Sequence, residues 1–185
     1  SSSPEGERPG VLAGRKFRPA NTRILFAGEK SGAEGETPMR EEGLTGAWEG
    51  PVPRVLIAGT NSGCGKTTLT CAVLQALVNR GMLVGSCKCG PDYIDPMFHS
   101  RIIGAKSSNL DLFFFDGNTA RCLLAKNGRD RDGGVIEGVM GYYDGMGLST
   151  IRASTYEVAQ ETDSPVVLAV NAKGASLSVL AVIQG

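Results

Sequence analysis

The strongest constraint on the fold is a buried strand that runs through a glycine-rich turn into a helix. Residues 54–59 read RVLIAG, a continuous apolar run ending in glycine, which is typical of a buried parallel strand. The turn, residues 59–68, reads GTNSGCGKTT. Residues 66–81 then place apolar side chains at helical spacing and end on Arg80 and Gly81, a common helix C-terminal signal. This stretch predicts a strand, a tight loop and a helix in direct succession.

The same alternation continues along the chain. We predict strands at 54–59, 82–88, 133–141 and 166–172, and helices at 66–81, 117–128, 155–165 and 176–184. Residues 109–115 are apolar and fit either a strand or part of a helix. Strands that alternate with helices predict an α/β fold, a P-loop NTPase-like doubly wound and mainly parallel sheet with helices on both faces. Because the chain stops in or just after a helix, we expect this domain, residues 54–185, to be incomplete.

Residues 1–53 have a different composition. Gly, Pro, Ser and charged residues dominate, and apolar periodicity is missing except around RILFAG at 23–28. We therefore predict a flexible or poorly structured N-terminal extension. Met39 is a candidate natural start, since the sequence from there leads straight into the first predicted strand.

Bulk composition restricts the classes of partner. The formal net charge is +0, which gives no electrostatic reason to expect nucleic acid or a membrane surface. No apolar run approaches the ~20 residues of a membrane-spanning helix. The five cysteines are odd in number and lack disulfide-framework spacing, so we expect reduced thiols in the cytoplasm.

The glycine-rich turn resembles the phosphate-loop pattern G-x-x-x-x-G-K-[ST]. Gly65, Lys66 and Thr67 fit, whereas the first glycine comes one place early at Gly59 and Thr60 stands in its place. Backbone N–H groups in such a turn form an anion nest at the positive end of a helix, with the lysine facing the β- and γ-phosphates and the threonine facing Mg²⁺. The pattern predicts a nucleoside triphosphate, bound by Thr60, Asn61, Ser62, Gly63, Cys64, Gly65, Lys66, Thr67 and Thr68.

Carboxylates follow several of the predicted strands. Asp92 and Asp95 lie beyond the second strand, Glu137 lies within the strand GVIEG, and Asp144 lies in GYYDG. The carboxyl ends of parallel strands meet at one sheet edge, so these groups should converge near the phosphate loop. Asp92 and Asp144 also fit ordinary turns. Glu137 interrupts an apolar strand, and because burying an unpaired carboxylate is costly, a functional role is favoured there.

A zinc site is a less favoured alternative for the segment KCGPDYIDPMFH and its surroundings. Cys87, Cys89 and His99 would supply three ligands, but their spacing is not that of a structural zinc site. We instead interpret His99, the only histidine, as a polar rim or packing residue.

Taken together, the motifs resemble one family. VLIAGTNSGCGKTT, KCGPDYIDPMFH, NLDLFF, EGVMGYYDG and PVVLAVNAKGAS match, in order and spacing, the cobyrinic acid a,c-diamide synthases over about residues 54–185. The loop itself also resembles that of dethiobiotin synthetases, and Asn61 stands where partition-type ATPases carry a signature lysine. The resemblance implies ATP- and glutamine-dependent amidation of the a and c side-chain carboxylates of cobyrinic acid in cobalamin biosynthesis. The reaction would pass through an acyl phosphate.

Two alternatives stay open beside that reading. One is a nickel-sirohydrochlorin a,c-diamide synthase of coenzyme F430 synthesis, which shares these motifs. The other is a nucleotide-binding fragment without turnover. The family also carries a C-terminal glutamine amidotransferase domain with a nucleophilic cysteine and a histidine. We expect that domain to be absent from this chain. Glutamine would then be used only through the missing domain, and we expect this chain to be inactive as a glutaminase. A tetrapyrrole substrate is expected, and a homodimer is allowed.

Site residues are implied by the same resemblance. The catalytic set is Lys66, Asp92, Asp95, Glu137 and Asp144. Magnesium is expected on Thr67, Asp92 and Glu137, and substrate on Tyr93, Tyr143 and Asp144. Lys88 starts the acidic loop and is expected to pair with it, and Asn171 and Lys173 are expected to help place ATP.

Overall fold

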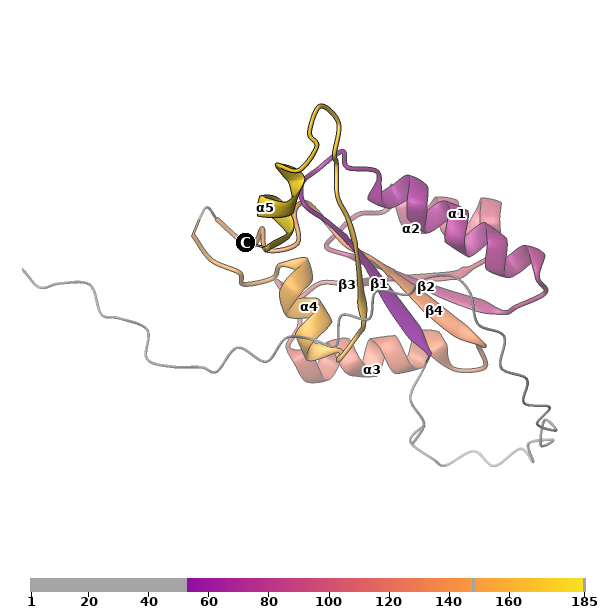
Figure 1. Ribbon diagram of the computed structural model, residues 1–185. Helices are drawn as coiled ribbons and strands as arrows, with labels where there is room; N and C mark the ends of the chain where they lie inside the picture. The colour runs from indigo at the N-terminus through magenta and orange to yellow at the C-terminus, as the bar shows by residue number, and fades with distance from the viewer. Residues whose placement is uncertain (1–52, 148, 185) are drawn as a thin grey trace, which may run out of the picture.

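The structure is a computed structural model that describes residues 53–147 and 149–184 (Figure 1). Its elements are β1 Arg54–Gly59, α1 Lys66–Asn79, β2 Val84–Cys89, α2 Ile94–Phe98, η1 His99–Ile103 (a π-helical turn), β3 Lys106–Leu110, α3 Gly117–Gly128, β4 Gly133–Glu137, α4 Thr155–Glu161, β5 Val166–Ala169 and α5 Val179–Gln184. The predicted N-terminal extension, apart from Pro53, and the proposed start at Met39 lie outside the described residues.

The five strands form one parallel sheet in the order β3-β2-β4-β1-β5. Parallel strands need crossover connections, and helices provide them here. The predicted α/β class is therefore confirmed. The register sets Ile57 of β1 and Lys88 of β2 directly beside Glu137 of β4. Two residues far apart in the sequence, Lys88 and Glu137, therefore become neighbours at the carboxyl end of the sheet.

Helices cover both faces of the sheet: α1 and α2 lie on one side, α3 and α4 on the other (Figure 1). Side chains alternate between the faces along each strand. In β2, Val84 belongs to the buried cluster that includes Leu74 of α1, whereas Cys87 and Cys89 belong to the cluster that includes Leu124 of α3. The alternation accordingly directs the intervening polar residues of β2 toward the α1 side.

The strands predicted at 133–141 and 166–172 end earlier, at Glu137 and Ala169, and two further segments differ more from the sequence-based prediction. Residues 109–115, which fit either a strand or part of a helix, contain only the end of a strand that begins earlier, β3 at Lys106–Leu110; Asp111 then starts a turn whose carbonyl accepts the N–H groups of Phe114 and Phe115. The acidic segment after β2 contains α2 and η1, where only a loop was expected. Pro96 lies in the first turn of α2, where a missing N–H is tolerated. Within the described ranges, every helix is too short or too polar to cross a bilayer.

Candidate nucleotide site

The phosphate loop joins β1 to the N-terminus of α1, a helix of 14 residues. Gly65, at the N-cap, has φ 96°, and Gly63 has φ 76°, both in the left-handed region that favours glycine. The free N–H groups of the first helical turn therefore face a tight loop, the arrangement that binds anions. Lys66 is largely buried, and its Nζ donates to the Asn61 carbonyl at 2.9 Å. The ammonium group thus folds back over its own loop.

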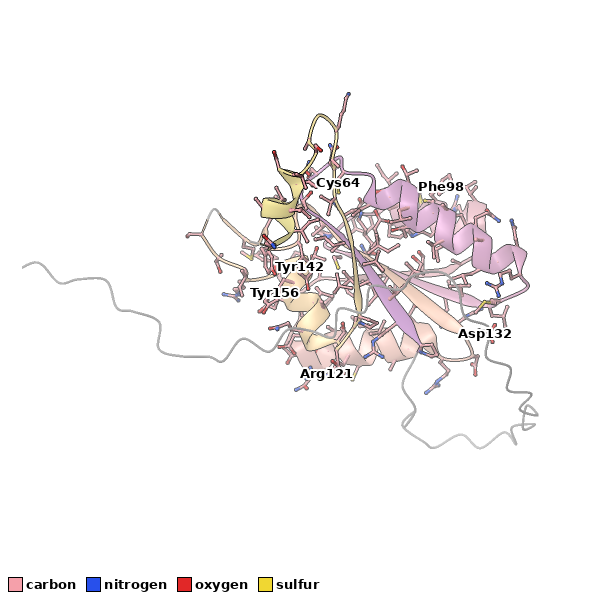
Figure 2. All side chains as sticks on the ribbon, in the orientation of Figure 1. Cys64, Phe98, Arg121, Asp132, Tyr142 and Tyr156 are labelled. Atoms are coloured by element: carbon pink, nitrogen blue, oxygen red, sulfur yellow. The ribbon has the colours of Figure 1, made fainter. Side chains whose placement is uncertain are left out.

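Gly59 explains why the first glycine of the motif comes one place early. A side chain at this position would collide with Sγ of Cys64 and press on the Lys66 side chain. The half-buried thiol of Cys64, labelled in Figure 2, occupies that space against the backbone. Gly59 is therefore required by close packing of the loop on the end of β1.

A cluster of charged groups lies where β2, β4, α1 and α2 meet. The Glu137 carboxylate is fully buried, and its Oε1 accepts from Thr67 Oγ1 at 2.5 Å and from Lys88 Nζ at 2.7 Å. Lys88 Nζ also lies 2.7 Å from Oδ2 of Asp95. The structure therefore brings together Thr67, Glu137 and Asp95 from the predicted set, and Lys88, which was expected to pair with the acidic loop, contacts both Asp95 and Glu137. We call these four residues the Glu137 cluster.

In the Glu137 cluster, burial and the contacts between charged groups shift the pKa values of Lys88 and Asp95. Burial acts to lower the pKa of Lys88, but the hydrogen bonds that its ammonium donates to Asp95 and Glu137, together with their negative charges, outweigh it and raise that pKa. Burial acts to raise the pKa of Asp95, but the Lys88 ammonium outweighs it and lowers that pKa. Lys88 and Asp95 are consequently both charged near neutral pH.

His99 is also part of this region, and of the two expectations for it, a polar rim residue or a packing residue, its burial fits the second. Its ring is fully buried, with Nδ1 2.8 Å from Ser86 Oγ and Nε2 3.4 Å from Glu137 Oε2. Burial lowers the pKa of His99 below its ordinary value, against the opposing charges of Glu137 and Asp95. The zinc alternative is wrong, because Cys87 and Cys89 lie in the core on the opposite face of the sheet.

Asp92 occupies a turn rather than the Glu137 cluster. Its Oδ1 accepts the N–H of Ile94 at 2.9 Å. The amide of Asn109, near the end of β3, donates to the carbonyls of Gly90 at 2.8 Å and Asp92 at 2.6 Å. Asn109 therefore fixes the acidic turn onto the neighbouring strand. Tyr93, which follows in this turn, is 76% exposed and projects away from the core.

The loop after β4 is tied to the base of the phosphate loop. The N–H of Tyr142 donates to the Gly59 carbonyl at 2.7 Å, and Asp144 Oδ2 accepts the Gly141 N–H at 2.7 Å. The Tyr142 ring meets that of Tyr156 in α4 edge to face, with ring centroids 5.5 Å apart (Figure 2), and the tilted Tyr143 ring lies 5.0 Å from that of Tyr156. Burial raises the pKa of Tyr142 to about 12. Tyr143 and Asp144 are thus exposed on an anchored loop.

The remaining predicted residues lie at the same sheet edge but outside the Glu137 cluster. The Thr60 N–H donates to the Ala169 carbonyl at 3.1 Å, which joins the loop to the end of β5. Asn171 and Lys173 follow β5, are exposed, and contact each other through the Lys173 N–H and Asn171 Oδ1 at 3.0 Å. Ser62 and Gly63 are exposed in the loop itself, and Thr68 is exposed in the first turn of α1.

The geometry defines a class of protein: an α/β domain whose phosphate loop, with a lysine and a threonine at a helix start, faces a buried carboxylate. A family model described as "CobQ/CobB/MinD/ParA nucleotide binding domain" matches residues 55–173. The chain belongs to this family, and it is a nucleotide-binding domain.

Curated relatives sharpen the assignment. A cobyrinate a,c-diamide synthase of Thermoplasma volcanium is 50% identical over 134 residues, which cover 72% of this chain and 29% of that protein. Those of Thermoplasma acidophilum and Listeria innocua are each 45% identical, covering 72% and 71% of this chain and 30% and 29% of theirs. The predicted resemblance to the cobyrinic acid a,c-diamide synthases is confirmed. The chain spans less than a third of the length of these relatives.

Proposed function

We propose that this domain uses ATP to activate a side-chain carboxylate of cobyrinic acid, or of a related tetrapyrrole, for amidation. A carboxylate oxygen of the substrate attacks the γ-phosphorus, and ADP leaves, giving an acyl phosphate. Ammonia then attacks the acyl carbon, and phosphate leaves as the amide forms. The observation that carries the proposal is the Glu137 cluster, buried directly against the first turn of the phosphate-loop helix.

Magnesium fits the donor set at this position. Mg²⁺ prefers oxygen ligands and needs only one or two protein groups beside nucleotide phosphates. Thr67 Oγ1 and Glu137 Oε1 supply two such oxygens, and Glu137 Oε2 is a buried acceptor that makes no hydrogen bond. In the described part of the chain, His, Cys, Asp and Glu form no group of three that would enclose a metal unaided. Bound there with nucleotide, Mg²⁺ would neutralise charge on the transferring phosphoryl group.

The basic side chains have separate tasks in the proposal. Lys66 leaves the Asn61 carbonyl and contacts the β- and γ-phosphates, since an ammonium gains more from a phosphate than from a backbone carbonyl. Lys88 stays between Asp95 and Glu137, contacts both carboxylates, and lowers the pKa of Asp95. Asp92, held in its turn by Asn109, faces the same edge and orders the water or phosphate shell. No protein nucleophile is required.

Substrate would be held by exposed groups at this edge. Tyr93 and Tyr143 present aromatic rings suited to a large, flat macrocycle, and Asp144 handles substrate or intermediate from its anchored loop. Asn171 and Lys173 are proposed to help place ATP. Release of ammonia from glutamine is assigned to sequence outside this chain, since the named relatives are more than three times as long as the matched part.

The test is chemical. Protein containing this domain receives ATP, Mg²⁺ and an ammonium salt or glutamine, with cobyrinic acid in one arm and nickel-sirohydrochlorin in the other. The expected product is a diamide, seen by mass spectrometry, with oxygen-18 from a labelled substrate carboxylate recovered in inorganic phosphate. Amide without label in phosphate would contradict the acyl phosphate, and no amide with either macrocycle would contradict the proposed function.

A further inference from the structure

One pair of buried polar side chains is not used in the proposed reaction. Ser86 and His99 are both fully buried on the α1 side of the sheet, and their Oγ and Nδ1 atoms are 2.8 Å apart. Within the described residues, the other ring nitrogen, Nε2, makes no hydrogen bond, and neither does Oε2 of Glu137. These two orphaned atoms face each other at 3.4 Å.

The two contacts define the arrangement of protons on the ring. A carboxylate oxygen only accepts, so a hydrogen bond between these atoms requires Nε2 to donate to Glu137, which leaves Nδ1 as the acceptor for the Ser86 hydroxyl. A buried polar atom without a partner costs about 1–3 kcal/mol, so a closure of a few tenths of an ångström satisfies both orphaned atoms at once. The result is a chain from the Ser86 hydroxyl through the ring to the carboxylate.

The local backbone structure fixes the position of the His99 ring beside Glu137. His99 begins the π-helical turn η1, and its carbonyl accepts the N–H of Ala105 at 2.9 Å. Ile103 and Ala105 belong to the buried cluster under α1, so the turn is anchored in the core. Asp95 lies four residues before His99, and helical spacing directs both side chains to the same side. One short helical segment thus directs Asp95 to Lys88 and His99 to Glu137.

We propose that His99 is a positioning residue that sets the orientation of the Glu137 carboxylate for the nucleotide-bound metal. This inference rests on the proposed function. The terminal torsion of a glutamate is broad, so a carboxylate held at one oxygen only can rotate. Thr67 and Lys88 hydrogen-bond Oε1, and the His99 ring nitrogen Nε2 lies 3.4 Å from Oε2. With His99 donating to Oε2 as proposed, both oxygens are held and Oε1 stays directed at the phosphate loop.

The test uses paired variants and a readout other than turnover. Mn²⁺ replaces Mg²⁺, and its affinity is measured by electron paramagnetic resonance in the presence of a non-hydrolysable ATP analogue. His99→Asn keeps a polar atom near Ser86 but is too short to reach Glu137, whereas His99→Gln places an amide N–H near the Nε2 position. We expect Mn²⁺ to bind about tenfold or more weakly to His99→Asn, and within about threefold of wild type to His99→Gln.

Controls separate positioning from general damage. Ser86→Ala should weaken Mn²⁺ binding in the same direction, whereas Ser107→Ala should not. Ser107 is the register partner of Ser86 on β3, and its buried hydroxyl has no hydrogen-bond partner in the described structure. Metal-free affinity for the analogue, measured in chelator, should stay within about twofold in every variant. The midpoint of urea unfolding shows whether each variant is folded. If a His99 variant does not fold, Mn²⁺ binding by Ser86→Ala still tests the inference.

The outcomes are distinct. Wild-type Mn²⁺ affinity in both His99→Asn and Ser86→Ala would overturn the positioning role while leaving the nucleotide site intact. Equal loss in His99→Asn and His99→Gln would overturn it as well, because the amide N–H would then have rescued nothing. Wild-type protein that binds neither Mn²⁺ nor the analogue would contradict the proposed function and this inference together.

Discussion

Lys88→Met is the perturbation whose outcome the structure determines most sharply. The ammonium lies 2.7 Å from both Glu137 Oε1 and Asp95 Oδ2, and the exposed fractions of the three side chains are 6% for Lys88, 0% for Glu137 and 20% for Asp95. Methionine replaces the stem of the lysine but leaves the fully buried carboxylate without a counter-ion. Removing one partner of a buried pair costs about 3–5 kcal/mol, because the remaining charge stays buried.

The assay is urea unfolding at neutral pH, followed by circular dichroism. With a slope of about 1.5 kcal/mol per M, the expected loss lowers the midpoint by about 2–3 M. Lys88→Met/Glu137→Gln should be more stable than Lys88→Met alone, since the second change removes the unpaired charge. Lys106→Met is the matched control, because Lys106 is an exposed lysine at the start of the neighbouring strand β3. It should shift stability by under about 1 kcal/mol.

Two results would refute this reasoning. A loss of under about 1 kcal/mol in Lys88→Met would mean that the ammonium does not stabilise a buried carboxylate. Equally, a double variant whose loss is the sum of the two single losses would mean that Lys88 and Glu137 do not interact, contrary to the 2.7 Å contact.

Three further outcomes are expected. Glu137→Gln should abolish turnover while the nucleotide still binds, as measured by phosphate release and by calorimetry; normal turnover would remove Glu137 from the metal site. Native alkylation should spare buried Cys87, whose pKa burial raises to about 11, and modify exposed Cys122 first; rapid labelling of Cys87 by peptide mass mapping would contradict the fold. Since burial lowers the pKa of His99, the unfolded state binds more protons below the ordinary value of 6.5, so the free energy of unfolding should decrease as pH falls through that region. One group limits the slope to about 1.4 kcal/mol per pH unit, and His99→Gln should have a flatter pH profile; an equal slope in both proteins would contradict this account.

The sequence predicted the site best where the residues concerned are neighbours in the chain. The buried strand and the glycine-rich turn before α1 predicted the phosphate loop, because strand, turn and helix are contiguous. Glu137 was found because a charged residue in an apolar strand is unusual. The position of β3 was missed, since its residues read KSSNL and the apolar run begins only at its end.

The side chains that contact Glu137 were harder to predict from the sequence. Lys88 lies 49 positions away and meets it only through the strand register of β2 and β4. His99 was assigned to packing or a rim because nothing in its neighbours indicates that Ser86, on the adjoining strand, lies beside its ring. Tyr156 of α4 is likewise joined to Tyr142 and Tyr143 by tertiary folding alone.

Binding of nucleotide to the phosphate loop and the Glu137 cluster is the central claim, and calorimetry tests it most directly. Titration of a non-hydrolysable ATP analogue with Mg²⁺ into this chain should give saturable binding at one site. Lys66→Ala should weaken that binding by about tenfold or more, because a charged contact to phosphate contributes at least about 1.5 kcal/mol. Absence of saturable heat with the wild-type chain, or equal affinity in Lys66→Ala, would contradict the account.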